Sequence, residues 1–335
     1  MKHFLGIDQG GTKTIAIVCD IEGNIKGVGY ESGLETVHFQ DTAGIFINRI
    51  RSAAEEACKK AGINLGDVSA VCGGLNGADW DFEYHALTEK LQQALLIEDA
   101  IVVNDCIGAM RGGSDSKNCA VVCAGSALNA AVRRADGEEI IYGYYIDGAH
   151  CGGSALGAGA LRKVMQSHLQ LCGETVLTDL VLSYTGHSNP EELLIELTMD
   201  RYKLHFKDLA PILLQAYADG DIEACSIVDE FNIGVAKYIT AAIKRLDMTN
   251  ISTDLVLSGS VFKNNGALAA EALYKEIIKE TPNVNMIHGK YEPVCGTTLI
   301  LLDREYNNNI PIEVNNNFEK TAGNNNLIRS LNKSG

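Results

Sequence analysis

The sequence has little positive charge. Of its 335 residues, 28 are lysine or arginine and 43 are aspartate or glutamate, so the net charge is -15. Nucleic-acid-binding proteins gather basic side chains on one face to neutralise phosphates, and this balance therefore argues against a nucleic-acid partner. An anionic ligand would have to be bound by a small local site.

Signals for export, membrane insertion and disulfide bonding are also missing. No apolar run reaches the roughly 18 residues that indicate a spanning helix, and the chain reaches Asp8 before an apolar signal-peptide region can form. The ten cysteines include no C-x-x-C pair and mostly stand in apolar runs, which is typical of small buried side chains in a reducing compartment. We expect a cytoplasmic protein without a membrane partner.

Helical and strand-like patterns alternate along the chain, and the length favours two domains. The first half predicts strands at 4–8, 12–20, 24–30, 68–72 and 100–103, with helices at 44–61, 82–96 and after 105. The second half predicts strands at 119–124, 128–134, 138–146, 254–258 and 284–288, with helices at 155–171, 222–246, 266–280 and 296–305. Each half therefore predicts an α/β core of order βββαβαβα.

The glycine turns of the two halves coincide when one half is laid over the other. Gly11-Thr12 then falls on Gly125-Ser126, and Gly23 on Gly137, which favours a duplicated domain. We expect domains at 1–116 and 117–306, the second with a helical insertion at 174–219, and a last helix, 296–305, that packs back on the first domain. The Asn-rich tail, 307–335, is expected to be poorly ordered.

The strongest local signal is the glycine-rich turn Asp8–Thr14, where an apolar strand ends in a carboxylate and turns into a second strand. Glycines let backbone N–H groups approach phosphate oxygens, because no Cβ stands between them. Asp8 could hold Mg²⁺ through water, and Thr12 could donate its hydroxyl to phosphate. The turn is not a Walker or dinucleotide loop, since those lead into a helix. A plain hairpin turn is the alternative.

Further candidates follow other strands. Asp105 stands at the carboxyl edge of a sheet, where a carboxylate can take a proton from a substrate hydroxyl, although Asp105 or Asn104 could instead simply cap the next helix. Gly125-Ser126 is the matching turn of the second half and would contact phosphates. Gly259-Ser260 would let an adenine or ribose lie against the backbone.

In this order and spacing, the motifs resemble the actin-like sugar-kinase superfamily, and within it the BadF/BadG/BcrA/BcrD ATPase and N-acetylglucosamine kinase family. The resemblance spans about residues 3–303 and rests on Asp8–Thr14, Gly74–Asp79, Asp105, Gly125–Asn129 and Ser258–Phe262. It implies two actin-like (ribonuclease H-like) domains that hold ATP and Mg²⁺ in the interdomain cleft.

The resemblance also implies roles for single residues. Asp105 falls at the position of the catalytic base, and Asp8 at the magnesium site. Nucleotide contacts are implied for Asp8, Gly10, Gly11, Thr12, Lys13, Thr14, Gly125, Ser126, Gly259 and Ser260. Sugar contacts are implied for Asn76, Gly77 and Asn129.

The family's sugar-binding features are less complete here than its nucleotide-binding features. The second turn reads Ala124-Gly125-Ser126-Ala127-Leu128-Asn129 in place of Ser-Gly-Thr-Gly-Ser-Asn, a Gly-Asp-Glu-Gly-Ser segment reads His150-Cys151-Gly152-Gly153-Ser154, and a sugar-binding Asn is replaced by Val37. Residues near these positions could substitute, and we include Thr36, His38 and Asp147 in the expected sugar site.

We therefore expect a homodimeric ATP-dependent kinase that phosphorylates a hydroxyl of a small sugar, N-acetylglucosamine or N-acetylmuramic acid. N-acetylmuramic acid is included because the loss of an acidic pair reduces the electrostatic repulsion of its anionic substituent. Two alternatives stay open. One is an ATPase that activates a partner reductase or dehydratase, which the missing C-x-x-C disfavours because such activators hold an iron–sulfur cluster. The other is a non-catalytic sugar sensor.

Overall fold

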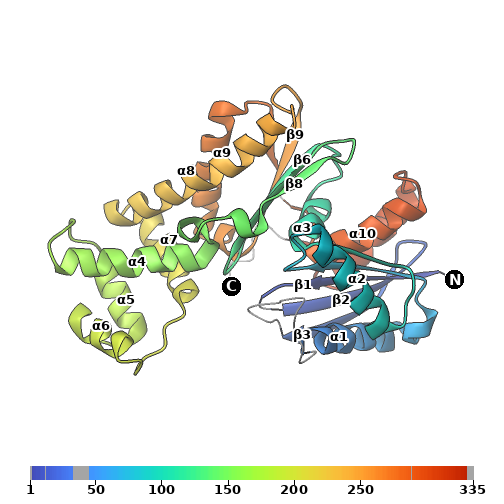
Figure 1. Ribbon diagram of the computed structural model, residues 1–335, viewed down its shortest axis with the longest axis horizontal. Coiled ribbons are helices and arrows are strands. Elements are labelled where there is room, and N and C mark those ends of the chain that lie inside the picture. Colours follow the sequence, from blue (N-terminus) through green and yellow to red (C-terminus); the bar gives the residue numbers. More distant parts are fainter. Residues whose placement is uncertain (1, 12, 33–44, 288, 330–335) are drawn as a thin grey trace. The chain divides into compact units, whose positions relative to one another are not determined.

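The structure is a computed structural model that describes residues 2–11, 13–32, 45–287 and 289–329 (Figure 1). The chain divides into two compact units. The first consists of Met1–Val121 and Ile287–Gly335, and the second of Val122–Met286. The chain thus leaves the first unit once and later returns to it.

The first unit is built on a five-stranded sheet of order β3-β2-β1-β4-β5. Its strands are β1 (His3–Gln9), β2 (Lys13–Asp20), β3 (Ile25–Ser32), β4 (Ala70–Leu75) and β5 (Ala100–Asn104). The first three form an antiparallel meander, whereas β1, β4 and β5 run parallel. Since parallel strands end at the same edge, the chain leaves β1, β4 and β5 at one place.

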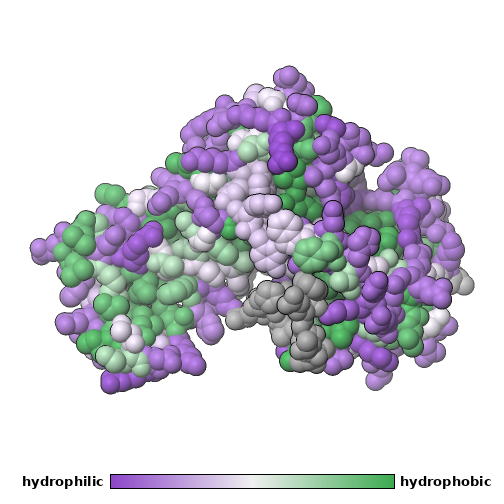
Figure 2. Space-filling model, in the orientation of Figure 1, coloured by the Kyte–Doolittle hydropathy of each residue, from purple (hydrophilic) through white to green (hydrophobic). Residues whose placement is uncertain are grey.

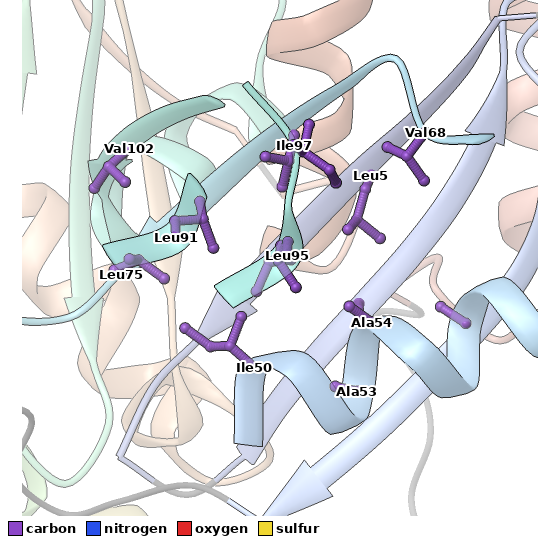
Figure 3. Packing of buried hydrophobic residues seen from close by; sticks show 14 of the residues in the cluster. Leu5, Ile50, Ala53, Ala54, Val68, Leu75, Leu91, Leu95, Ile97 and Val102 are labelled. Carbon is purple, nitrogen blue, oxygen red and sulfur yellow. The ribbon is translucent and has the colours of Figure 1, made fainter. Parts of the chain in front are cut away.

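Helices cover both faces of this sheet, as the alternation of side chains along β1 requires. Leu5 packs with Ile50 of α1 (Ile45–Ala61) and Leu91 of α2 (Asp81–Leu95) on one face (Figure 3). Phe4 packs with Leu301 of α10 (Pro293–Glu305) on the other. Helix α10 also contacts α3 (Asp105–Gly113). It lies very close to β1, because a Cβ built on Gly6 would be 2.0 Å from Thr298 Oγ1.

The second sheet repeats this arrangement, with order β10-β9-β6-β7-β8. Its strands are β6 (Cys119–Ala124), β7 (Leu128–Arg133), β8 (Glu139–Ile141), β9 (Thr253–Ser258) and β10 (Val284–Ile287). Written from the other end, this order is β8-β7-β6-β9-β10, which matches β3-β2-β1-β4-β5 of the first sheet strand by strand. The expected α/β class with two matching cores is therefore confirmed.

One predicted strand is wrong over most of its length. The strand expected at 138–146 ends at Ile141, and the chain continues through 3-10 turns at Gly143–Tyr145 and Gly148–His150. Tyr142 has a helical backbone, and Gly143 has φ +46°, a left-handed conformation that glycine adopts readily and that ends an extended strand.

The second unit carries the helices α4 to α9. Three of them, α4 (Gly152–His168), α8 (Ile222–Arg245) and α9 (Gly266–Glu280), correspond to expected helices, and the insertion contains α5 (Leu177–Thr185), α6 (Pro190–Thr198) and α7 (Ala210–Ala218). The Asn189 side chain caps α6 by accepting a hydrogen bond from Glu192 N. Within the described ranges, no helix is long and apolar enough to cross a membrane.

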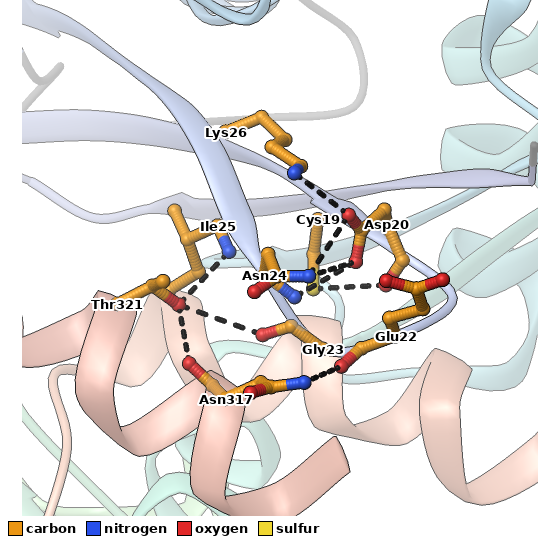
Figure 4. A network of polar contacts seen from close by, with 9 residues as sticks. All are labelled: Cys19, Asp20, Glu22, Gly23, Asn24, Ile25, Lys26, Asn317 and Thr321. Carbon is orange, nitrogen blue, oxygen red and sulfur yellow. Dashed lines mark hydrogen bonds and ion pairs between the residues drawn. The ribbon is translucent and has the colours of Figure 1, made fainter. Parts of the chain in front are cut away.

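The expectation of poor order after residue 306 is wrong for residues 312–329. Helix α11 (Ile312–Asn324) buries Val314, Phe318 and Ala322 against the first unit. It also fixes the β2–β3 turn, because Thr321 Oγ1 accepts a hydrogen bond from Ile25 N and Asn317 donates one to Glu22 O (Figure 4). The three buried residues are spaced four apart and form one apolar stripe, which the abundance of asparagine concealed.

Candidate active site

Three carboxylates, those of Asp8, Asp79 and Asp105, gather at the carboxyl edge of the first sheet. Asp8 is the last residue but one of β1 and pairs with Gly74 of β4, and Leu75 of β4 pairs with Asn104 of β5. Asp105 therefore starts α3 directly beyond the neighbouring strand end. The edge position that the sequence predicted for Asp8 and Asp105 follows from this register.

Asn104 organises the edge. Its Oδ1 accepts a hydrogen bond from Cys106 N at 3.0 Å and so caps α3. Its Nδ2 donates to Ala78 O at 3.0 Å and to Asp79 Oδ1 at 2.9 Å. The sequence left open whether Asn104 or Asp105 caps this helix, and the cap is Asn104. Asn104 also binds the loop after β4 through Ala78 and Asp79.

Burial and the repulsion of neighbouring carboxylates raise the pKa values of Asp105 and Asp8. Burial raises the pKa of Asp105 to about 7, and the charges of Asp8 and Asp79 add to the rise. Burial also raises the pKa of Asp8 to about 6; Lys13 lowers it, and Glu292 raises it further. Such a cluster favours either a cation or a proton held between its members.

The glycine turn lies beside this cluster. Gly10 N donates to Lys13 O at 3.0 Å, so the turn closes the β1–β2 hairpin. A Cβ built on Gly10 meets no described atom within 4 Å, and its φ is not left-handed. Nothing in the described chain therefore requires glycine at this position, and the space beside it is open. Thr12 lies outside the described residues.

Several buried polar atoms at this edge have no hydrogen-bond partner among the described residues. They are Gln9 Oε1, Thr14 Oγ1 and Asn76 Oδ1. Buried polar atoms in native proteins are normally satisfied, so these three suit water or a polar ligand. Together with the open space at Gly10, they fit a hydrated cation with phosphate.

Although three carboxylates gather here, no three His, Cys, Asp or Glu side chains in the part of the chain that the structure describes are arranged so that they could hold one metal ion by themselves. This observation does not conflict with Mg²⁺ at Asp8. Magnesium usually keeps several waters and takes one or two carboxylates together with substrate phosphates, rather than a cage made only of protein.

In the second unit, the structure brings Gly125-Ser126 and Gly259 together. Gly153 N donates to Gly125 O at 2.8 Å and Ser154 N to Ser126 O at 2.9 Å, so the turn is held by the start of α4. Gly259 has φ +104°, and a Cβ there would be 2.2 Å from Ala124 O. Glycine is thus required by the fold at 259, whereas a Cβ on Gly125 meets nothing within 4 Å.

Two expected sugar contacts lie near a pocket of about 800 Å³ in the second unit. Asp147 lines it and accepts hydrogen bonds from Ala149 N and, at 2.9 Å, from His150 Nδ1 when that nitrogen is protonated. Asn129 Oδ1 accepts from Gly143 N at 2.9 Å, which fixes one side of the loop. The pocket wall also includes Tyr142, Lys237 and Tyr238. Thr36 and His38 lie outside the described residues.

Sequence reasoning missed Glu292 and the two tyrosines of the pocket. Glu292 stands before α10 and lies 3.3 Å from Lys13 Nζ. An acidic residue followed by Pro293 is a helix-start signal, but nothing in the sequence says that this start lies beside a turn near residue 10. Tyr142 and Tyr238 belong to no motif.

Two sheets of one strand order, each with a glycine turn after its first strand, define a duplicated actin-like α/β protein. The chain belongs to the BadF/BadG/BcrA/BcrD ATPase family, whose sequence model matches residues 5–300. The family predicted from the five motifs is therefore confirmed.

Relatives match nearly the whole chain. An N-acetylmuramic acid/N-acetylglucosamine kinase of Clostridium acetobutylicum is 24% identical over 308 residues, which cover 90% of this chain and 98% of that protein. An N-acetyl-D-glucosamine kinase of Dictyostelium discoideum is 26% identical over 320 residues, with the same coverage. The crystal structure of a ROK family glucokinase from Streptomyces griseus, in complex with glucose and AMPPNP, has a TM-score of 0.58 at 16% identity and covers 89% of this chain and 98% of that chain; this likeness concerns the fold.

Proposed function

We propose that the protein is an ATP-dependent kinase that phosphorylates a hydroxyl of an N-acetylated aminosugar, N-acetylglucosamine or N-acetylmuramic acid. The observation that carries the proposal is the placement of Asp105 beside Asp8 at the carboxyl edge of the first sheet. Two relatives named as kinases of these sugars, similar over 90% of the chain, support it.

Asp105 is the proposed catalytic base. Phosphoryl transfer depends mainly on positioning and charge stabilisation, and one group must accept the proton of the attacking hydroxyl. A carboxylate with a pKa of about 7, raised first by burial and then by Asp8 and Asp79, is matched to that task near neutral pH. Asn104 fixes the start of α3 and so the place of Asp105.

The nucleotide is proposed to contact the first glycine turn. Mg²⁺, when bound, neutralises charge on the phosphates, and Asp8 is the carboxylate that would hold it through water. The backbone N–H group of Gly11, the Lys13 ammonium and the hydroxyls of Thr12 and Thr14 are the proposed phosphate donors. Gly10, whose N–H group is bound to Lys13 O, is proposed to contact the phosphate through the open space beside its Cα. Gly125 and Ser126 are proposed as phosphate contacts of the second unit, and Gly259 and Ser260 as contacts of the adenosine.

Sugar contacts are proposed for Asn76, Gly77, Asn129 and Asp147. Asn76 Oδ1 is buried without a hydrogen-bond partner among the described residues, as suits an acceptor for a ligand hydroxyl. Asp147 has a 57% exposed side chain and offers a charged acceptor near the position of the missing acidic pair. Thr36 and His38 remain predictions of the sequence.

Assembly as a homodimer in the cytoplasm belongs to the same proposal. Large apolar side chains are exposed on α5 and α6, among them Tyr184, Leu194 and Ile195 (Figure 2), and exposed apolar patches often mark protein interfaces. All ten cysteines are unbridged, most of them buried, as suits a reducing compartment. Light scattering of the purified protein would test the dimer.

The experiment that tests the function is ADP release from Mg-ATP with and without sugar. N-acetylglucosamine, N-acetylmuramic acid, glucosamine and glucose are offered in turn. We expect release that depends on an N-acetylated sugar. A clear preference for glucose would contradict the aminosugar, release without any acceptor would favour the ATPase, and sugar binding without release would favour the sensor.

A further inference from the structure

A short segment, residues 325–329, runs beside the start of α10. Glu292 N donates a hydrogen bond to Leu327 O at 2.9 Å, and Arg329 N donates one to Lys290 O at 3.0 Å. Between these bonds, Tyr291 and Ile328 form an antiparallel bridge. Leu327 is buried in the core of the first unit. The segment is therefore anchored, and it places Arg329 next to Glu292.

Glu292 lies between two cations. Its Oε2 is 3.3 Å from Lys13 Nζ, and its Oε1 is 3.7 Å from Arg329 Nε. The side chains of Glu292 and Arg329 are 18% and 16% exposed, whereas that of Lys13 is 49% exposed. Arg329 is thus the sheltered partner of the carboxylate, and Lys13 is the partner with room to move towards a ligand.

The three charges of Lys13, Glu292 and Arg329 affect the pKa of Asp8 at the carboxyl edge of the first sheet. Burial has the largest effect on Asp8 and raises its pKa; beside that effect, Lys13 lowers the pKa, Glu292 raises it and Arg329 lowers it. All three side chains therefore lie within electrostatic range of the carboxylate that is proposed to hold Mg²⁺.

We propose that Arg329 is a positioning residue for the nucleotide, because it keeps Glu292 neutralised when Lys13 exchanges its ion pair with Glu292 for the ATP phosphates. The inference rests on the proposed function, since it needs a polyphosphate at the turn that contains Lys13. A polyphosphate carries several negative charges against one on Glu292, so it attracts the ammonium more strongly.

Arg329 is important because Glu292 loses one of its two cationic partners when Lys13 moves to the phosphates. A partly buried carboxylate without a cation is costly, and here it would stand beside Asp8 and the incoming anion. Arginine stays charged at any pH at which the protein is folded, so Arg329 compensates Glu292 throughout. The coupling is reciprocal: bound nucleotide leaves Arg329 as the main cation of Glu292 and holds the segment 325–329 more firmly.

The test compares Arg329→Gln, Glu292→Gln and the double variant by titration with Mg-ADP and by steady-state kinetics. We expect Arg329→Gln to raise the Kd for Mg-ADP and the KM for ATP about fivefold or more, with kcat and the KM for sugar within twofold of wild type. Adding Glu292→Gln should restore nucleotide affinity, because no carboxylate then needs compensation. Arg329→Lys should retain most of it.

Lys290→Gln is the matched control. It removes the 2.7 Å ion pair between Lys290 and Glu319, which joins the stretch before α10 to α11, the helix directly ahead of the segment 325–329. Lys290 is not among the charges that shift the pKa of Asp8. We expect its nucleotide affinity to equal that of the wild type. An equally weak Lys290→Gln variant would mean that any loosening of this region weakens binding, and would overturn the inference.

The other outcomes separate the inference from the proposed function. Wild-type protein that binds Mg-ADP, with Arg329→Gln binding it equally well, would overturn the inference and leave the function standing; a double variant as weak as Arg329→Gln would do the same. Wild-type protein that binds no nucleotide would overturn both. If Arg329→Gln does not fold, hydrogen exchange of the wild-type Arg329 amide decides: slower exchange with Mg-ADP supports the inference, and an unchanged rate contradicts it.

Discussion

The chemistry proposed for this protein depends on one residue, Asp105. Asp105→Asn keeps the shape of the side chain and removes its ability to accept a proton, so we expect kcat to fall by about 10²–10⁴-fold, the usual contribution of a general base. Binding of Mg-ADP, measured by titration, should change little. Asp115→Asn, whose side chain is 93% exposed near the end of α3, is the control and should have wild-type turnover. Turnover of Asp105→Asn within a few-fold of wild type would exclude a base at this position.

The raised pKa of Asp105 also predicts a dependence on pH. Burial, with the charges of Asp8 and Asp79, raises this pKa to about 7, so the base becomes protonated below that pH. We expect kcat/KM to fall by about tenfold per pH unit there, as the free enzyme loses its base. A profile that stays flat down to pH 5 would contradict the assignment.

The same shift predicts how stability changes with pH. The folded pKa lies above the unfolded value, so the stability associated with the protonated acid is lost as pH rises through about 7. The Asp105→Asn variant does not lose this stability, because asparagine does not titrate. Urea unfolding should therefore show a gain in stability for the variant over wild type that is larger at pH 8 than at pH 5. An equal gain at both pH values would mean that Asp105 has an ordinary pKa.

At the scale of elements, the glycine turn and the glycines of the sheet serve different purposes. A Cβ on Gly10 meets no described atom within 4 Å, so Gly10→Ala should change the free energy of unfolding by less than about 1 kcal/mol. It should still weaken Mg-ADP binding at least tenfold if phosphate approaches the backbone there. Gly66→Ala, where a Cβ is equally unhindered, should change neither quantity. Unaltered affinity in a folded Gly10→Ala variant would place the phosphates elsewhere.

Gly6→Ala is expected to give the opposite result. Its Cβ would lie 2.0 Å from Thr298 Oγ1 and 2.9 Å from Thr297 Oγ1, and both threonines are fully buried in α10. We expect a loss of about 1–3 kcal/mol in urea unfolding from overpacking between β1 and α10. An unchanged unfolding midpoint would show that α10 can move away from the sheet at little cost.

The sequence could predict those features that depend on neighbouring residues, but not contacts between residues far apart in the chain. The place of Asp8, Gly10 and Asp105 in the fold could be predicted because each stands at or just beyond the end of a strand that the neighbouring residues indicate. Glu292 was missed because only the packing of α10 on β1 brings it to Lys13. The strand expected at 138–146 was too long because the backbone leaves the extended conformation at Tyr142 and Gly143. The alternation of apolar residues contains no information about these backbone angles.

For the whole molecule, the division of the chain into units has a consequence for its synthesis. The first unit is completed by Ile287–Gly335, and its sheet is covered on one face by α10 and α11, which come from this late part of the chain. During translation, a nascent chain that has produced β1 to β5 therefore carries a sheet with one bare apolar face. The intervening Val122–Met286 can collapse as a unit in the meantime, since domains tend to fold as they emerge. The strands β1 to β5 therefore gain their second cover only after α10 and α11 have been synthesised. Until then, we expect this early sheet, rather than the later Val122–Met286 unit, to be the part of the chain that nascent-chain chaperones bind.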